Sequence, residues 1–158
     1  HIHDSLRQER EIVEVFTGSD SYSQGLSDFR MRAEHAREYI VIGGEAKDWY
    51  EFTKPIFPEH VEQLRKLKRA GVDIFILFYE QEKMSAEKYI RPYLRNPYVC
   101  KIAADACRLP QTSWLAGEYV YLLTPTTEPL VVSIKSKRLS EQYRDYFWKQ
   151  WKTGKLLK

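Results

Sequence analysis

The sequence is poor in the features that mark several special classes of protein. It has two cysteines in 158 residues, Cys100 and Cys107, and they lack the CxxC spacing of a redox or zinc motif. Two cysteines are too few for the disulfide framework of a secreted domain, which favours a reducing, cytoplasmic compartment. No apolar run approaches the roughly eighteen residues of a membrane span, and no basic segment followed by an apolar one indicates a secretion signal.

The charge is also unexceptional. Twenty-five Lys and Arg residues stand against 22 Asp and Glu, so the net charge of +3 is too small to predict nucleic-acid binding. An aromatic content of 14% excludes intrinsic disorder. The length fits one domain with a substantial core.

Apolar strands and amphipathic helices alternate along the chain. We expect strands at 11–16, 39–42, 72–79, 99–103, 114–116, 119–124 and 130–135, and helices at 21–38, 59–70, 85–94 and 137–152. Ser21 and Gln24 have the spacing of a capping box at the first helix. Residues 39–79 form a strand–helix–strand unit, which predicts a parallel strand pair. The pattern predicts a single α/β domain with a mixed sheet of about six or seven strands.

A candidate ligand site follows from the ends of these strands. Open α/β sheets hold ligands at the carboxyl ends of their strands, and Gly43-Gly44-Glu45 follows one such end. The turn lacks GxGxxG and GxxxxGK[ST], so an ordinary tight turn is the simpler interpretation. If a pocket exists, the loops after 42, 79 and 124 converge on it. The predicted ligand-binding residues are Glu45, Trp49, Tyr79, Glu80 and Thr126.

A second candidate is an anion site at the start of the last helix. Helix N-termini attract anions, and Ser136 and Lys137 stand at this start, between Lys135 and Arg138. Exposed, solvated charge is the alternative interpretation.

Neither a metal site nor a catalytic group is predicted. His35 and His60 have no second ligand at metal spacing, and the chain has no GxSxG motif. Cys100 and Cys107 lie among small apolar residues, which favours burial. No cofactor is expected.

The order of these elements resembles a known family. The most specific segments are RAGVDIFILFYE at 69–80 and EYVYLLTPTTEPLVVSIKSKRLSEQYRDYFWKQWK at 118–152, above all its YRDYFWKQWK ending. Over roughly 10–152 the chain resembles the C-terminal effector domain of TrmB-type prokaryotic transcription regulators. The resemblance implies a phospholipase D-like fold and a homodimer. It also implies a small-molecule effector, for which a sugar is one candidate, and an upstream winged helix through which the parent protein binds DNA.

The resemblance also tests for catalysis. Phospholipase D enzymes need His-x-Lys-x4-Asp, in which the histidine attacks phosphorus and the lysine binds the phosphate. Placing Glu118 at the acidic position puts Gln111 at the histidine position and Ser113 at the lysine position, and no His-x-Lys occurs anywhere in the chain. The resemblance therefore implies a non-catalytic domain.

Three functions follow from this comparison. The first is a ligand-sensing and dimerising domain of a transcription regulator, in contact with neither membrane nor, by itself, DNA. The second is a dimerisation scaffold without a ligand. The third is a phosphodiesterase, which the missing His-x-Lys motif disfavours. We expect 1–10 to be the end of a linker or a cloning remnant, 11–152 the effector domain and 153–158 a basic tail.

Overall fold

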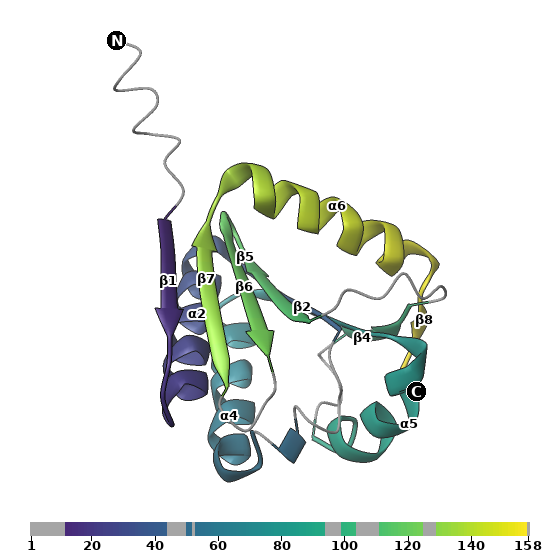
Figure 1. Ribbon diagram of the computed structural model, residues 1–158. Helices are drawn as coiled ribbons and strands as arrows, with labels where there is room; N and C mark the ends of the chain where they lie inside the picture. The colour runs from purple at the N-terminus through teal and green to yellow at the C-terminus, as the bar shows by residue number, and fades with distance from the viewer. Residues whose placement is uncertain are drawn as a thin grey trace.

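The computed structural model describes residues 12–43, 50, 51, 53–93, 99–103, 111–124 and 129–157. These residues contain one eight-stranded mixed sheet in the order β1-β7-β6-β5-β2-β3-β4-β8 (Figure 1). The strands are β1 (Ile12–Phe16), β2 (Glu38–Ile42), β3 (Asp73–Phe78), β4 (Val99–Ile102), β5 (Thr112–Ala116), β6 (Tyr119–Thr124), β7 (Leu130–Lys135) and β8 (Lys155–Leu156). The pairs β2–β3 and β3–β4 are parallel and the others antiparallel.

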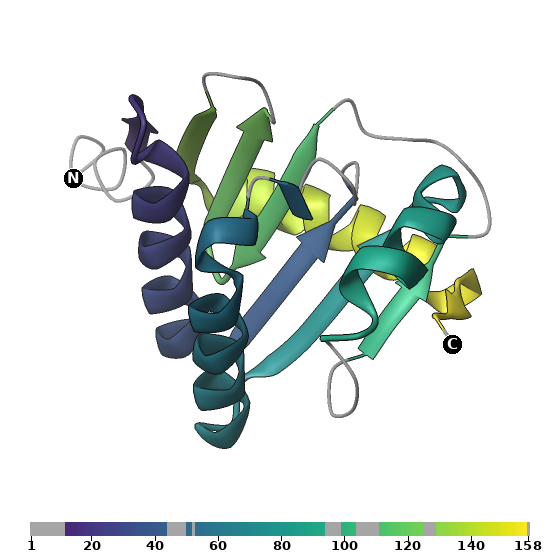
Figure 2. The same cartoon turned by 90° about the horizontal axis from the view of Figure 1, so that it is seen from below.

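Helices cover both faces of the sheet. The long helices are α2 (Ser21–Ala36), α4 (Phe57–Arg69) and α6 (Lys137–Thr153), and the short ones are η1 (Lys54–Ile56), η2 (Glu80–Glu82), α5 (Lys83–Ser85) and η3 (Ala86–Ile90). Helices α2 and α4 lie on one face and α6 on the other (Figure 2). No helix among the described residues is both long and apolar enough to cross a bilayer.

The alternation of side chains along each strand divides the core into two layers. The layer under α2 and α4 includes Phe29, which stacks on Trp114 with 5.1 Å between ring centroids. The layer under α6 includes Phe147 and Trp151, which lie one helical turn apart on α6. Cys100 is buried, as predicted, and burial raises the pKa of its thiol to about 12.

Three local expectations differ from the structure. Helix α2 has Asp20 at its N-cap, and no side chain caps it. The predicted capping box is therefore wrong: the Ser21 hydroxyl instead donates to Pro129 O at 2.7 Å. The sheet has one strand more than expected, because Lys155 and Leu156, within the expected basic tail, pair with β4. The helix expected at 85–94 is a π-helical turn that ends at Ile90.

Candidate functional site

The carboxyl ends of β2 and β3 meet the start of β5 at one edge of the sheet. Ile42, the last residue of β2, pairs with Leu77 of β3 and with Ser113 of β5. Gly43 follows, and its N–H donates to Leu77 O at 2.7 Å. Its φ of 60° suits glycine, which has no Cβ to strain. We call this region the carboxyl edge; it is where the sequence places its candidate ligand residues.

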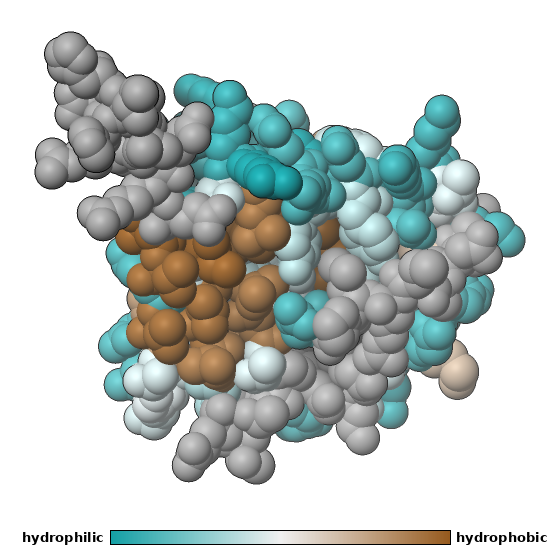
Figure 3. All heavy atoms as spheres, turned by 45° about the horizontal axis from the view of Figure 1, so that its top comes forward, coloured by the Kyte–Doolittle hydropathy of each residue, from teal (hydrophilic) through white to brown (hydrophobic). Residues whose placement is uncertain are grey.

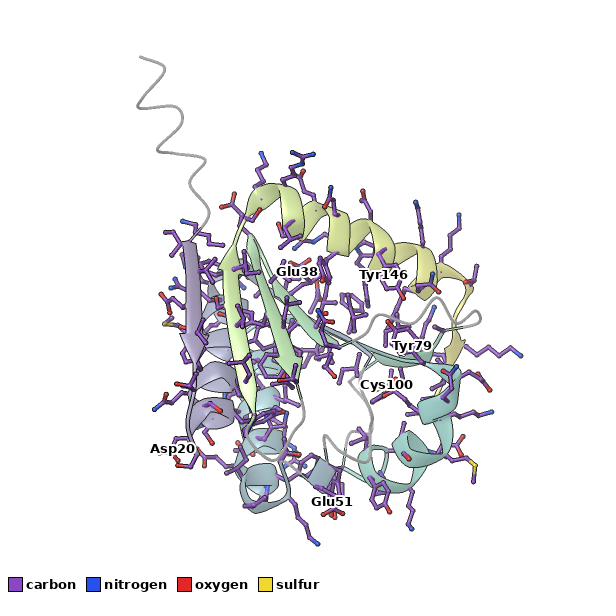
Figure 4. The ribbon with its side chains drawn as sticks, viewed as in Figure 1. Asp20, Glu38, Glu51, Tyr79, Cys100 and Tyr146 are labelled. Carbon is purple, nitrogen blue, oxygen red and sulfur yellow. The ribbon has the colours of Figure 1, made fainter. Side chains whose placement is uncertain are left out.

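Tyr79 fills the α6 side of the carboxyl edge. Its side chain is fully buried. A Cβ on Gly43 would lie 2.1 Å from Tyr79 Cε2, so the ring packs directly on the glycine backbone. The Tyr79 hydroxyl lies 3.0 Å from the Tyr146 hydroxyl of α6, and the two rings point toward each other in Figure 4. Tyr79 is thus part of the core between the sheet and α6.

The other predicted ligand residues are divided between described and undescribed parts of the chain. Glu80 is exposed and begins η2, directly after Tyr79. Glu45, Trp49 and Thr126 lie outside the described residues. Of the two candidates within the described residues, Tyr79 has its side chain inside the core and Glu80 has its side chain in solvent.

The two positions that the resemblance places at the phospholipase D motif, Gln111 and Ser113, lie beside and on β5. Ser113 is fully buried, and its Oγ has no hydrogen-bond partner among the described residues. Gln111 precedes the strand and is half-buried. The described histidines lie elsewhere. His60 is buried on α4 beside Arg30, and burial together with the Arg30 charge lowers its pKa to about 3. A histidine nucleophile is thus absent from the described part of this edge.

The predicted anion site uses its serine internally. Ser136 is buried at the N-cap of α6, and its Oγ accepts a hydrogen bond from Leu139 N at 3.1 Å. Its own backbone N–H donates to Glu118 O. Lys137 is exposed. The Ser136 hydroxyl therefore caps the helix, while Lys137 points to solvent.

A charged cluster that the sequence does not reveal lies at the opposite, amino edge of β2. Arg144 of α6 donates to both carboxylate oxygens of Glu38, at 2.9 and 2.7 Å, and to Gly117 O at 2.8 Å. The Gly117 N–H donates back to Glu38 Oε2. This Arg144–Glu38 clamp ties α6 to β2 and to the β5–β6 turn, as the position of Glu38 beneath α6 in Figure 4 shows. Because these residues are far apart in sequence, no local pattern predicts the clamp.

A cavity of about 390 Å³ opens at the same amino edge, between the end of α2 and the β5–β6 turn. Arg32, Tyr119 and Lys135 line it. Tyr119 and Lys135 become neighbours only through the β6–β7 register. Sequence reasoning singled out Lys135 beside the helix start but had no signal for the other two.

Besides the clamp and the cavity, the structure has an apolar area on the α6 side of the sheet that α6 does not cover. Val131 packs on Gly25 of α2, so the alternation of side chains turns its neighbours to the opposite face. Val13 and Val15 of β1 pair with Ile134 and Val132 there. Figure 3 shows the area as a continuous apolar surface beside the hydrophilic α6. Val13 and Val15 are 58% and 55% exposed. We call this surface the apolar face; its other described members are Leu122 and Leu130.

The chain was compared with known proteins at the levels of sequence and structure. No protein-family model and no curated protein matches its sequence. Among solved structures it is similar to Nuc, a phospholipase D family member from Salmonella typhimurium, with a TM-score of 0.62 and 14% identity over 93% of this chain and 98% of that one. NucT from Helicobacter pylori matches with a TM-score of 0.61 and 12% identity, over 92% and 98% of the two chains.

A third similar structure is larger. TrmBL2, described as an archaeal chromatin protein with a novel mode of DNA binding, matches with a TM-score of 0.55 and 15% identity. The match covers 98% of this chain but 57% of TrmBL2. The three likenesses define the fold as phospholipase D-like, which confirms the fold class predicted from sequence.

Proposed function

We propose that this chain is a non-catalytic phospholipase D-like domain that senses a small effector and dimerises in a TrmB-type cytoplasmic transcription regulator. Its DNA-binding winged helix would lie upstream of the sequence given. The observation that carries the proposal is the chemistry at β5. With Glu118 placed at the acidic position of the motif, Gln111 and Ser113 fall where the enzymes of this fold need a histidine nucleophile and a phosphate-binding lysine.

Physical chemistry supports the loss of catalysis. A glutamine amide is a poor nucleophile, and a buried serine hydroxyl carries no charge to hold a phosphate. Ser113 also lacks a hydrogen-bonding base among the described residues. A domain with these residues keeps the fold, but it lacks the nucleophile and the phosphate-binding cation that phosphodiester hydrolysis needs.

The likeness to TrmBL2 supports the DNA-associated role. This chain corresponds to little more than half of that DNA-binding protein. The remainder of such a parent protein would read DNA, which agrees with the weak net charge of +3 in this domain.

The apolar face supports dimerisation with a second copy of this chain. Continuous exposed apolar surface marks an interaction site. Val13, Val15, Val132 and Ile134 bring no charge to it. An uncharged apolar surface is complementary to itself, which a two-fold symmetric interface requires. The face also borders β1, an edge strand whose outer side no described strand pairs.

The effector would bind at the carboxyl edge, near Glu80. A thermal-shift screen against sugars, sugar phosphates, nucleotides and amino acids tests this. A ligand at a hundred times its Kd stabilises the folded state by about 2.7 kcal/mol. We expect a shift that Glu80→Gln reduces, whereas Glu141→Gln on the exposed face of α6 leaves it unchanged. A shift equally reduced by both variants would contradict a site at Glu80.

A second candidate function is a dimerisation scaffold without an effector. The burial of Tyr79 against Gly43 and Tyr146 favours it, because the ring occupies space that a ligand at this edge would use. A well-folded dimer with no response in the whole screen would select the scaffold over the sensor.

A further inference from the structure

We propose that the cavity at the amino edge binds the phosphate group of a small organic ligand between Arg32 and Lys135. This site lies at the other end of the strands from the carboxyl edge. The proposal stands on its own geometry and is independent of the effector site at Glu80.

The first observation is two cations on one aromatic ring. The guanidinium carbon of Arg32 lies 4.4 Å from the centroid of the Tyr119 ring, and Lys135 Nζ lies 6.0 Å from the same centroid. The ring face attracts each cation and fixes its position. Two cations beside one ring repel each other, and an anion that contacts both relieves this repulsion.

The second observation is that neither cation is neutralised by protein. Within the described part of the chain, Arg32 and Lys135 form no ion pair, and the Arg32 Nε is buried without an acceptor. A buried donor without an acceptor is costly. The guanidinium thus presents a planar set of donors of the kind that matches phosphate oxygens in pairs.

Three described carboxylates lie near these two cations, and of the three Glu118 alone lines the cavity. Glu38 is held by Arg144 in the clamp. Asp28, one helical turn before Arg32, accepts a hydrogen bond from the Tyr121 hydroxyl. Glu118 lines the cavity but is exposed. Among the described residues that line the cavity, Arg32 and Lys135 stand against the single carboxylate of Glu118, so the lining carries more positive than negative charge.

The shape of the cavity fits a ligand larger than a bare ion. Its volume of about 390 Å³ lies in the range of pockets for small organic molecules. Gly117 has no side chain to fill the cavity at its wall; a Cβ there would lie 3.1 Å from Ala36 Cβ. A compact molecule bearing a phosphate would place that group on Arg32 and Lys135 and its body along this wall.

The register of the sheet places the cavity beside the start of β1. Lys135 pairs with Tyr119 on one side and with Ile12 on the other. Ile12 is the first residue of β1, the edge strand of the sheet (Figure 1). A ligand held by Lys135 would therefore lie close to the start of β1. A link from there to an upstream DNA reader rests on the proposed function.

The test is isothermal titration at constant ionic strength with four probes: pyrophosphate, glucose 6-phosphate, glucose and a short DNA duplex. We expect a phosphate-bearing small molecule to bind and glucose alone not to bind. Arg32→Gln and Lys135→Gln should each weaken binding about tenfold or more, as the loss of a charged hydrogen bond predicts. Lys149→Gln, at an exposed lysine of α6, should change it by less than about twofold.

Three results would overturn the proposal. They are no binding of either small phosphate, an equal loss in Lys149→Gln, and binding of the duplex alone. Arg32→Lys keeps the charge and guards against a folding defect in Arg32→Gln; it should bind more weakly than wild type because it lacks the planar fork. A phosphate response lost in Arg32→Gln but retained in Glu80→Gln separates this site from the proposed effector site.

Discussion

At the scale of single residues, His60 couples stability to pH. Its ring is buried on α4, with Arg30 NH1 3.5 Å from Nδ1. Burial and this charge both disfavour the imidazolium, so the pKa falls from 6.5 to about 3 on folding. The unfolded chain therefore binds one proton more than the folded chain between these values, and stability must fall as the pH drops below about 6.5.

We predict that the free energy of unfolding attributable to His60 decreases by about 2 kcal/mol between pH 7 and pH 5. His60→Gln should remove most of this pH dependence, whereas His35→Gln, on the exposed end of α2, should retain it. Urea denaturation at several pH values measures both. An unchanged slope in His60→Gln would assign the dependence to other groups.

Gly43 tests the packing of Tyr79 at the carboxyl edge. Gly43→Ala should destabilise the chain by about 2–4 kcal/mol, because it adds a left-handed alanine and a collision with the buried ring. Gly18 has a φ of 93° and no atom within 4 Å of an added Cβ. Gly18→Ala should therefore cost only the backbone penalty, about 1–2 kcal/mol. Equal losses in urea denaturation would show that Tyr79 does not press on Gly43.

At the scale of elements, the Arg144–Glu38 clamp joins α6 to the sheet. Both side chains are about three-quarters shielded, with 24% and 22% exposure. A bidentate pair with a further bond to a backbone carbonyl is stronger than a surface ion pair. The clamp fixes the β5–β6 turn through Gly117, and that turn forms one wall of the cavity.

We predict that Arg144→Gln and Glu38→Gln each destabilise the chain by about 2 kcal/mol, and that the double variant loses less than their sum. The coupling energy from a double-mutant cycle measures the clamp. The exposed Arg69–Glu62 pair is the control, with side chains 69% and 45% exposed; Arg69→Gln should cost less than about 0.5 kcal/mol. Additive losses at the clamp would refute a direct interaction.

The elements also show what sequence can and cannot predict. The unit at 39–79 could be predicted because two continuous apolar runs flank an amphipathic helix. This pattern is typical of two parallel strands joined by a helix, and β2 and β3 do pair in parallel. The two residues of β8 carry no strand pattern, since Lys155 and Leu156 gain their conformation from β4. Likewise, the Ser21 hydroxyl does not cap α2 as predicted, because it donates a hydrogen bond to Pro129 O, which is distant in sequence. Local patterns therefore fixed the elements, and long-range contacts decided their ends.

The same limit applies to the candidate sites. Tyr79 and Glu80 were predicted because they lie at the end of a recognisable strand, and their role in ligand binding stays a prediction. The burial of the tyrosine involves Tyr146 of α6, which is distant in sequence. Arg32, Tyr119 and Lys135 meet only when α2, β6 and β7 are assembled. A cation on a helix and an aromatic on a strand are individually unremarkable in sequence, so the cavity needed the structure.

At the scale of the whole molecule, the apolar face predicts a dimer. We expect sedimentation equilibrium to give twice the 18.8 kDa of one chain. Val15→Glu, on the apolar face, should raise the dimer Kd about tenfold or more, because the interface would bury two carboxylates. Met31→Glu, equally exposed but on α2, should leave it unchanged. A monomeric wild type at high concentration, or dimerisation indifferent to Val15→Glu, would contradict this interface.

We propose that this molecule keeps the phospholipase D-like fold without phosphodiesterase activity. The most direct measurement is the hydrolysis of bis(p-nitrophenyl) phosphate by the purified chain, with Gln111→Ala and Ser113→Ala as variants. We predict no turnover above buffer for any of the three proteins, because neither aligned side chain can attack phosphorus or hold its charge. Turnover by the wild type that either variant abolishes would contradict the absence of catalysis and show that the chain is a phosphodiesterase.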